Sequence, residues 1–488
     1  MTDLEPSPLA ATTRQTLSHA ARTFTEPYSP QLRTGLILTG TGTGGAYHAG
    51  VLRALHEAGV KIDIVGAHGI GVVGALFAAV DGAQRLWDEK GFWRSYGART
   101  LYPWGRMLRI IVWAFVLAIA IVAVPLAISA LGLIIYPIDF MLKMIGVGDP
   151  GGLLARYLRF MEAASAPDVL PTWLPRFVVL VLGCVGVVAL ATGWLGASRR
   201  RVRGPFWWRI VRPPLSSAEA AAHCWRAVWD LVRGAAQLKQ PESTELGRRY
   251  IELVGENLGQ PGFRELVLAV HDLDAHRDLI FALVTEPRRR DLIRRVTSEA
   301  TEERRAEIFD LSGVARDYLV DVVAGALAVP VASEPSTVTF APDSYWRGET
   351  HRLCDRPASV TRVLQELLDL GAEQLIVVSA ATDTSGPHTL TAPRIDGRGR
   401  FGEYLQSAET ATVRDTTRLA AEAPVKLFTI RPAHNPVGPF DFSGAFDDRS
   451  DRRPRLNELI ARGYEDAYRQ FIEPVVGASG DRVGQGAS

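Results

Sequence analysis

Two short apolar runs near the start of the chain, each followed by a glycine-rich turn, predict the first part of an α/β sheet. Residues 35–38 (GLIL) and 62–67 (IDIVGA) have the length and apolar character of buried strands. A segment with helical spacing of its apolar residues follows each turn, and the first of these helices is expected to end at Gly59. Strand, turn and helix, repeated twice, is the pattern of a βαβ unit. The predicted fold class is therefore α/β with a mostly parallel central sheet.

Two longer apolar segments do not fit a soluble α/β domain. Residues 110–135 form a run of 26 residues without a charge, and residues 177–195 add 19 more. At about 1.5 Å per residue, the first run is long enough to cross a hydrocarbon layer of roughly 30 Å. We therefore expect a transmembrane helical hairpin, with a pair of buried core helices as the alternative. Pro125 leaves two forms open for the first span, a kinked helix or a re-entrant hairpin.

Arginines outside the two apolar segments predict which side of the membrane each part occupies. The loop of about residues 147–173 carries only Arg156 and Arg159. The outer flanks are richer in arginine and contain Arg94, Arg99, Arg106, Arg109, Arg199, Arg200, Arg201 and Arg203. By the positive-inside rule, both outer flanks lie in the cytoplasm. We expect a multi-pass membrane protein with two spans and with the bulk of the chain in the cytoplasm.

The hairpin divides the chain into parts that differ in composition. The first part is rich in Ser, Thr and Pro and lacks the apolar core of a secretory signal. Two crossings return the chain to the side that it left, so the α/β segments before and after the hairpin can form one domain. The predicted parts are a flexible arm (1–32), the first part of the α/β domain (33–105), the hairpin insertion (106–200, with spans of about 110–135 and 177–195), the second part of the domain (201–476) and a flexible tail (477–488).

Composition excludes several classes of function. The 488 residues carry a formal net charge of +1, whereas nucleic-acid-binding proteins usually have a basic surplus. Cys184, Cys224 and Cys354 are too few and too scattered for a disulfide framework or a zinc site. We therefore expect no nucleic-acid partner, no metal and no cofactor.

The glycine-rich segment TGTGTGG at residues 39–45 is the first candidate for chemistry. Such a turn between a strand and a helix presents backbone N–H groups and the positive end of the helix to an anion. Gly40, Gly42 and Gly45 also fit the spacing GxGxxG of a dinucleotide site. Residues 65–67 (VGA) close the next strand without the acidic residue of such a site, so nucleotide binding is the less favoured alternative.

Several segments resemble patatin-like phospholipases, in the order in which that family has them. Residues 38–55 (LTGTGTGGAYHAGVLRAL) resemble the oxyanion loop, and residues 67–71 (AHGIG) resemble the nucleophile elbow, G-x-S-x-G. Residues 321–332, 344–359 and 367–381 resemble the later helix and turn, the strand end that carries the family's aspartate, and the helix and strand that follow. The resemblance implies a three-layer α/β domain that the hairpin interrupts.

The resemblance extends over about residues 33–100 and 245–470, and it implies roles for the glycine loop. In this family a serine attacks an acyl ester, an aspartate assists as base, and backbone N–H groups hold the oxyanion. The residues that match the oxyanion loop are Gly40, Gly42, Gly44 and Gly45.

The chain departs from the family at the positions that carry this chemistry. The nucleophile position falls on Gly69, and the base position falls on Arg347. Gly348 follows, and Glu349 stands where a second glycine is expected. The basic residue common in the oxyanion loop falls on Gly44. Glycine suits the strained elbow backbone but supplies no nucleophile, and a guanidinium cannot accept a proton at neutral pH.

Neighbouring polar residues are candidates to replace the missing groups. His68 flanks the elbow and is a candidate base or weak nucleophile. Asp355 lies eight residues past Arg347, and we expect it to cap the next helix. Together with Gly71 and Gly348, these two residues are the candidate lining of the cleft that the resemblance implies.

Serines elsewhere are weaker substitutes for the nucleophile. Ser379 follows an apolar strand and faces the edge of the expected cleft. Ser95 and Ser129 lie far from any predicted strand–helix turn. The pair Asp396–Gly397 fits a turn rather than the family's aspartate and glycine.

Two hypotheses about function follow. The favoured one is a membrane-anchored, patatin-like protein that is catalytically impaired and binds lipid or a protein partner. The alternative is an active lipid acyl hydrolase that uses substitute catalytic residues. Because a fold does not fix a function, the residues at the elbow decide between them.

Overall fold

The computed structural model describes the chain in nine stretches that leave out the first 26 and the last 12 residues. The described residues are 27–146, 152–199, 213–234, 236, 238–294, 306–382, 397–422, 424–432 and 456–476. Most of the predicted arm and all of the predicted tail lie outside them. The chain forms two compact units: Met1–Pro103 together with Leu215–Ser488, and Trp104–Pro214. We call the first the α/β unit and the second the helical unit.

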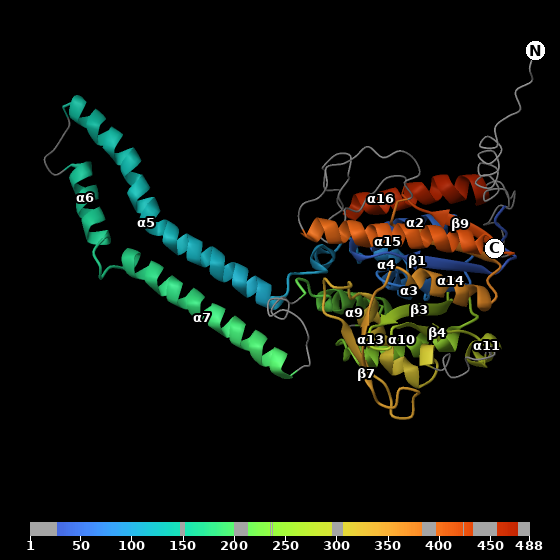
Figure 1. Ribbon diagram of the computed structural model, residues 1–488. Coiled ribbons are helices and arrows are strands. Elements are labelled where there is room, and N and C mark those ends of the chain that lie inside the picture. The colour runs from blue at the N-terminus through green and yellow to red at the C-terminus, as the bar shows by residue number, and fades with distance from the viewer. Residues whose placement is uncertain are drawn as a thin grey trace, which may run out of the picture. The chain divides into compact units, whose positions relative to one another are not determined.

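A mostly parallel sheet, with nine strands among the described residues, forms the centre of the α/β unit (Figure 1). Its main order is β5–β4–β3–β2–β1–β8–β9, and β7 pairs with both β3 and β6. The strands β3, β2, β1, β8 and β9 run parallel to one another. The predicted α/β class with a mostly parallel sheet is therefore confirmed. The strands are β1 (Thr34–Thr39), β2 (Ile64–Ala67), β3 (Glu265–Asp272), β4 (Arg277–Leu283), β5 (Ile308–Asp310), β6 (Ser336–Thr339), β7 (Thr350–Cys354), β8 (Gln374–Ser379) and β9 (Lys426–Ile430).

Helices pack on both faces of the sheet, which gives three layers. Along β1 the side chains alternate: Leu36 and Leu38 belong to one core, and Ile37 belongs to the other. The second core is closed mainly by α14 (Ser359–Asp369). The helices that contribute to the first core include α2 (Gly45–Glu57), α3 (Gly71–Ala78), α9 (Ala218–Val232), α10 (Ser243–Asn257), α13 (Leu319–Ala326) and α16 (Leu456–Ala467).

Shorter elements and one long helix complete the α/β unit. The long helix α15 (Gly397–Ala420) contributes Leu405 to the first core and Val413 to the second. The remaining elements are α4 (Gln84–Trp87), η2 (Tyr96–Thr100), α11 (Arg288–Arg294), η3 (Val314–Tyr318) and the π-helix η4 (Tyr468–Val476).

The first βαβ unit forms where the apolar runs predict it. β1 and β2 are parallel neighbours, and Leu38, one residue before the end of β1, pairs with Ala67 at the end of β2. The glycine loop after β1 contains a short turn, η1 (Gly42–Gly44), before α2 begins. The elbow after β2 leads into α3 at Gly71. Both turns therefore lie at the carboxyl edge of the sheet, where open α/β sheets bind their ligands.

The helical unit consists of α5 (Arg106–Met144), α6 (Leu153–Ala164) and α7 (Leu170–Arg199). α5 is one continuous helix with Pro125 and Pro137 inside it, so the re-entrant form of the first span is wrong. α6 and α7 both pack against α5. Gly132 makes room for the docking of α6, because a Cβ there would lie 2.8 Å from the Tyr157 hydroxyl, which donates to the carbonyl of Ile128 at 3.1 Å.

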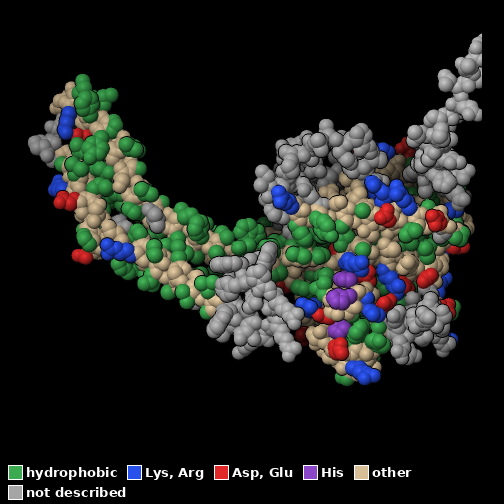
Figure 2. Space-filling model, viewed as in Figure 1, with side chains coloured by type: hydrophobic (Ala, Val, Ile, Leu, Met, Phe, Trp, Pro, Cys, Tyr) green, Lys and Arg blue, Asp and Glu red, His purple; other side chains and the backbone are tan. Residues whose placement is uncertain are grey.

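The apolar surface of α5 is exposed rather than packed into a core. Among the described residues, α5 is the one helix that is long and apolar enough to cross a membrane by length and composition, over Leu108–Met144. Only 6% of its apolar window is buried within the structure, and Figure 2 shows hydrophobic side chains along much of the helical unit. The apolar part of α7, Thr172–Val187, is shorter. The predicted pair of spans is therefore supported for one helix only.

Candidate functional site

The glycine loop and the elbow contact each other at the carboxyl edge of the sheet. The carbonyl of Gly40 accepts a hydrogen bond from the backbone N–H of Ile70 at 2.9 Å. Gly71 lies so close to the carbonyl of Leu38 that a Cβ at this position would collide with it. Gly42 has φ of +60°, a left-handed backbone that favours glycine. The two turns that the sequence singled out therefore form one structure.

The remaining glycines of the loop are packed closely against side chains. A Cβ on Gly45 would collide with the ring of Trp93, and a Cβ on Gly44 would lie 3.0 Å from the Cβ of Ala380. The N–H of Gly44 donates to the carbonyl of Thr41 at 3.3 Å. The loop is thus held by close packing.

Gly69 stands at the apex of the elbow and leaves no room for a side chain. Its φ is +56°, which is strained for any residue with a Cβ. A Cβ on Gly69 would collide with the carbonyl of Gly40 and would lie 2.8 Å from Oδ2 of Asp355. The N–H of the residue after a nucleophile commonly donates to the oxyanion, but here the N–H of Ile70 donates to Gly40. The apex therefore lacks a nucleophile, and this conformation does not accommodate one.

Asp355 is the carboxylate beside the apex. It directly follows β7 and is buried. Its Oδ1 accepts from Nδ1 of His68 at 3.0 Å and from the N–H of Arg356 at 2.8 Å, and its Oδ2 accepts from the hydroxyl of Thr41 at 3.4 Å. The expectation that Asp355 caps the next helix is wrong, because α14 has Ala358 at its N-cap and no side-chain cap.

The structure places Arg347 away from the apex, in the turn between β6 and β7. Arg347 has φ of +47° and Gly348 has φ of +83°, and the N–H of Arg347 donates to the carbonyl of Ser344 at 3.1 Å. The five residues of β7 separate this turn from Asp355, at roughly 3.3 Å per residue. The group next to Gly69 is therefore the carboxylate of Asp355 and not the guanidinium of Arg347. The assignment of Arg347 to the base position beside Gly69 therefore does not agree with the structure.

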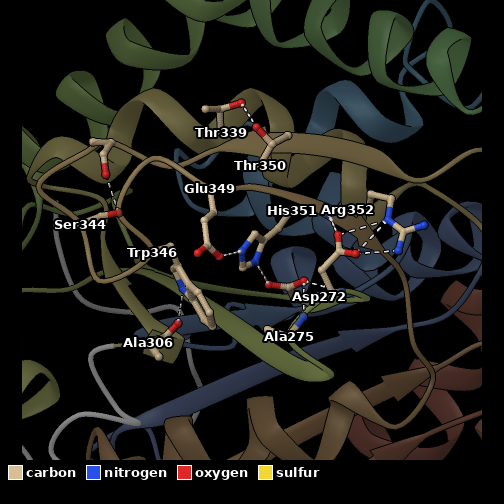
Figure 3. A network of polar contacts seen from close by, with 12 residues as sticks. Asp272, Ala275, Ala306, Thr339, Ser344, Trp346, Glu349, Thr350, His351 and Arg352 are labelled. Carbon is tan, nitrogen blue, oxygen red and sulfur yellow. Dashed lines mark hydrogen bonds and ion pairs between the residues drawn. The ribbon is translucent and has the colours of Figure 1, made fainter. Parts of the chain in front are cut away.

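A second buried histidine–aspartate pair holds the β6–β7 hairpin (Figure 3). Nδ1 of His351 lies 2.5 Å from Oδ2 of Asp272, and its Nε2 lies 3.2 Å from Oε2 of Glu349. Burial alone would lower the pKa of His351, but the hydrogen bonds and charges of Asp272 and Glu349 outweigh burial and raise it. The ring of Trp346 packs against the imidazole, with centroids 4.5 Å apart. We call Asp272, His351 and Glu349 the hairpin cluster.

His68 links Asp355 to a hydroxyl on β1. Its Nε2 lies 2.6 Å from Oγ1 of Thr39, and its Nδ1 faces Asp355. Burial alone would lower the pKa of His68, but the hydrogen bond and charge of Asp355 outweigh burial, and the pKa is raised. All three residues are buried. We call Thr39, His68 and Asp355 the apex cluster.

Glu409 brings another buried carboxyl group next to the apex cluster. It comes from α15, and Oγ of Ser379 donates to its Oε1 at 3.0 Å. Burial raises the pKa of Glu409 to about 7; the positive charges of His68 and Arg431 oppose this shift, and the charge of Asp355 adds to it. Ser379, a candidate nucleophile by sequence, is thus the hydrogen-bond donor of an acid. Sequence patterns gave no sign of Glu409, because α15 follows the site by a long stretch of chain.

His48 lies on the other side of the glycine loop. Its Nε2 lies 3.0 Å from the carbonyl of Thr39, and a Cβ on Gly40 would lie 3.6 Å from the imidazole. Burial lowers the pKa of His48 to about 4. His48 is therefore neutral at physiological pH and donates to the backbone of the strand that carries Thr39.

The other sequence candidates lie elsewhere or outside the described residues. Oγ of Ser95 donates to the carbonyl of Phe92 at 2.7 Å, and Ser129 lies within α5. Gly397 is the first residue of α15, and Asp396 lies outside the described residues. Within the described stretches, no group of three or more His, Cys, Asp or Glu side chains could hold a metal ion.

Comparison with known proteins bears on the family. No family model matches the chain. The mouse patatin-like phospholipase domain-containing protein 6 is 42% identical over 69 residues, which are 14% of this chain and 5% of the mouse protein. A patatin-like phospholipase domain-containing protein of Caenorhabditis elegans is 56% identical over 45 residues, or 9% of this chain and 3% of that protein. A lysophospholipase of Aspergillus fumigatus is 51% identical over 45 residues, with the same coverage.

These matches confirm the resemblance to patatin-like phospholipases over short segments, and the chain matches only about a twentieth or less of each relative's length. Among solved structures, VipD from Legionella pneumophila has a TM-score of 0.31 and 13% sequence identity, covering 92% of this chain and 67% of that chain. A TM-score this low does not establish a common fold.

Proposed function

We propose that this chain is a membrane-anchored, patatin-like protein that binds phospholipid or lysophospholipid and does not hydrolyse it by serine chemistry. The ligand class comes from the relatives, whose names describe phospholipases and lysophospholipases. The loss of hydrolysis comes from this chain's own residues.

The observation that carries the proposal is that the apex of the elbow, at Gly69, has no space for a side chain. Gly69 supplies no nucleophile, and the carboxylate of Asp355 and the carbonyl of Gly40 take the space where a side chain would stand. The N–H of Ile70 donates to Gly40 and is not free for an oxyanion. In enzymes with a nucleophile–base unit, removing the nucleophile lowers kcat by about 10⁶.

The exposed apolar surface of α5 supports membrane anchoring. Large hydrophobic side chains such as Leu117, 60% exposed, and Leu133, 79% exposed, face outward along the helix. Apolar surface of this extent needs a nonaqueous partner, because soluble monomers seldom expose patches above a few hundred Å². A lipid bilayer satisfies both the length and the apolar character of this helix.

The topology of the sheet supports a return of the chain to its starting side. β1 and β2 precede the helical unit and pair with β8 and β3, which follow it. Both flanks of the helical unit therefore lie on one side of the membrane, and a crossing by α5 requires a second crossing. We assign the return to α7, and the arginine pattern puts both flanks in the cytoplasm.

Ester turnover in full-length protein, incorporated into phospholipid vesicles, tests the loss of hydrolysis. We expect no release of fatty acid from lysophosphatidylcholine above the rate of vesicles without protein, while the protein retains lysophosphatidylcholine in a binding assay. Sustained turnover at about 1–10³ per second, the ordinary enzymatic range, would contradict the proposal.

Membrane anchoring has its own test with a matched pair of variants. A charge near the centre of a span costs about 2.5–3.5 kcal/mol on insertion scales. Leu117→Arg should therefore weaken the retention of the protein in vesicles that are floated on a density gradient, and Leu117→Ala should not. Equal flotation of both variants would show that α5 does not anchor the protein in the membrane.

The two-span topology is tested with cysteine labelling in whole cells. In a Cys184→Ser background, a membrane-impermeant maleimide should label Ser165→Cys but not Glu89→Cys until the cells are broken. Protection of residue 165 in intact cells would show that the helical unit does not cross the membrane.

A further inference from the structure

The apex cluster has the connectivity of a hydroxyl–imidazole–carboxylate triad. Oγ1 of Thr39 lies 2.6 Å from Nε2 of His68, and Nδ1 of the same imidazole lies 3.0 Å from Oδ1 of Asp355. In hydrolytic triads the carboxylate orients the imidazole through Nδ1, and Nε2 takes the proton of the hydroxyl. The difference here is that the hydroxyl comes from the last residue of β1 and not from the apex of the elbow.

We propose that Thr39, His68 and Asp355 form a nucleophile–base–orienting unit that accepts one acyl group from an ester onto Thr39. This inference rests on the proposed function: with no nucleophile at Gly69, Thr39 is the hydroxyl that contacts the histidine beside it. The chemical class of substrate is a carboxylic ester, as in the acyl esters of lipids.

The step balances as an acyl transfer. Oγ1 of Thr39 forms a bond to the carbonyl carbon, and its proton passes to Nε2 of His68. The bond between the carbonyl carbon and the alcohol oxygen then breaks, and the leaving alcohol takes that proton from His68. Asp355 orients the imidazole through Nδ1 and stabilises the imidazolium that forms. The products are an ester on Thr39 and a free alcohol.

The location of the cluster favours this reaction. Thr39 and His68 stand at the carboxyl ends of adjacent parallel strands, β1 and β2. The N-termini of α2 and α3 begin at Gly45 and Gly71 in the same two turns. Their partial positive charge favours the negative charge that develops on the carbonyl oxygen.

Burial sets the rate of the reaction. Thr39 is 0% exposed, His68 is 1% exposed and Asp355 is 3% exposed, so an ester reaches them only when the site opens locally. Water that would cleave the threonine ester faces the same barrier. We therefore expect slow acylation that stops after one acyl group per chain, rather than turnover.

The test is intact-mass measurement of the full-length protein after incubation with p-nitrophenyl butyrate. We expect one butyryl group per chain, and peptide mapping should place it on Thr39. The reaction should be faster above the raised pKa of His68, where the imidazole is neutral and can accept the proton. The carboxyl groups that raise this pKa are those of Asp355, Glu409 and Asp278, and His48 is the other imidazole that interacts with His68.

Matched variants separate nucleophilic attack from a structural role. Thr39→Val removes the hydroxyl at nearly constant volume and should abolish acylation at this position, because valine has no oxygen that can form the ester, whereas Thr39→Ser should keep it. Thr361→Val is the control, because it removes a threonine hydroxyl that contacts Thr416, at 2.7 Å, and no member of the apex cluster. It should acylate at the wild-type rate.

Two results would overturn the inference: wild-type protein that takes up no butyryl group, or a butyryl group that maps to another residue. Neither depends on whether a variant folds. A different result would contradict the proposed function, namely the cleavage of many ester molecules per chain. An acylated Thr39 with sustained turnover would uphold this inference and overturn the loss of hydrolysis.

Discussion

The apex cluster and the hairpin cluster contain the same buried pair, a histidine whose Nδ1 faces an aspartate. They differ in the group at Nε2, which is the hydroxyl of Thr39 for His68 and the carboxylate of Glu349 for His351. With carboxylates on both nitrogens, His351 ties the β6–β7 hairpin to β3 and contacts no hydroxyl of the described residues through its ring (Figure 3). With a hydroxyl on one nitrogen, neutral His68 can accept a proton from it. A histidine–aspartate pair therefore does not define a reactive site until its third partner is known.

Removal of the buried carboxylate from the hairpin cluster should lower the stability of the protein more than any of the changes that follow. Asp272→Ala removes the partner of His351 and also the acceptor of the N–H groups of Asp274 and Ala275. Breaking a buried pair in this way costs about 3–5 kcal/mol in the free energy of unfolding. Chemical denaturation measures it, and acylation at Thr39 should persist under native conditions.

Asp274→Ala is the matched control for this variant. Asp274 pairs with Arg352 on the surface of the same hairpin, and exposed pairs contribute about 0–1 kcal/mol. Equal losses from the two variants would mean that burial of the hairpin cluster does not determine its contribution.

The next prediction concerns how the stability of the protein depends on pH. Glu409 lies beside the apex cluster and not beside the hairpin cluster, so its titration affects the apex cluster. The pKa of Glu409 is about 7 in the folded protein, above the ordinary value of 4.5 for a glutamate. A carboxyl group with a raised folded pKa stabilises the fold when protonated, so stability should fall as the pH rises from about 4.5 through 7. The loss is about 3 kcal/mol at most, at 1.36 kcal/mol per pKa unit.

Glu409→Gln should flatten this part of the stability–pH curve, because glutamine remains neutral and can still accept the hydrogen bond from Ser379. The measurement is the urea midpoint of both proteins at a series of pH values. An unchanged slope in the variant would exclude Glu409 as the titrating group.

A smaller effect concerns the space at the apex. Gly69→Ser forces a Cβ against Gly40 and Asp355 and should destabilise the protein by about 1–3 kcal/mol. Gly371→Ser is the control, because Gly371 has φ of +83° but has no atom within 4 Å of a Cβ. The difference between the two variants isolates the collision from the backbone strain.

The smallest effect concerns the exposed partner of His351. The side chain of Glu349 is 66% exposed, so Glu349→Gln should change stability by about 0–1 kcal/mol. The pKa of His351 is raised, so its contribution is present below about pH 6.5 and is lost as the pH rises through the folded pKa. The variant should move this loss to lower pH, which NMR titration of the imidazole detects. A shift in the opposite direction would mean that Glu349 does not stabilise the cation.

Local patterns in the sequence predicted the first βαβ unit, the glycine loop and the position of Gly69. Each of these features depends on residues that are close in the chain. His68 and Asp355 were expected to line one cleft, but their direct contact and the contact of His68 with Thr39 were not predicted, because Asp355 lies 287 positions from His68 and sequence spacing does not reveal such contacts. For the same reason Arg347 was assigned to a position that Asp355 occupies in space. The apolar length of residues 110–135 predicted α5, whereas the shorter apolar part of α7 falls below the same criterion.

The elbow carries Gly69 at its apex, and Thr39 is the hydroxyl that contacts the neighbouring histidine. The most direct measurement is the number of p-nitrophenol molecules released per chain from p-nitrophenyl butyrate by full-length protein in vesicles. We expect a slow release that ends at about one molecule per chain, the signature of acylation without turnover. Continued release of many molecules per chain, undiminished in Thr39→Val, would contradict it.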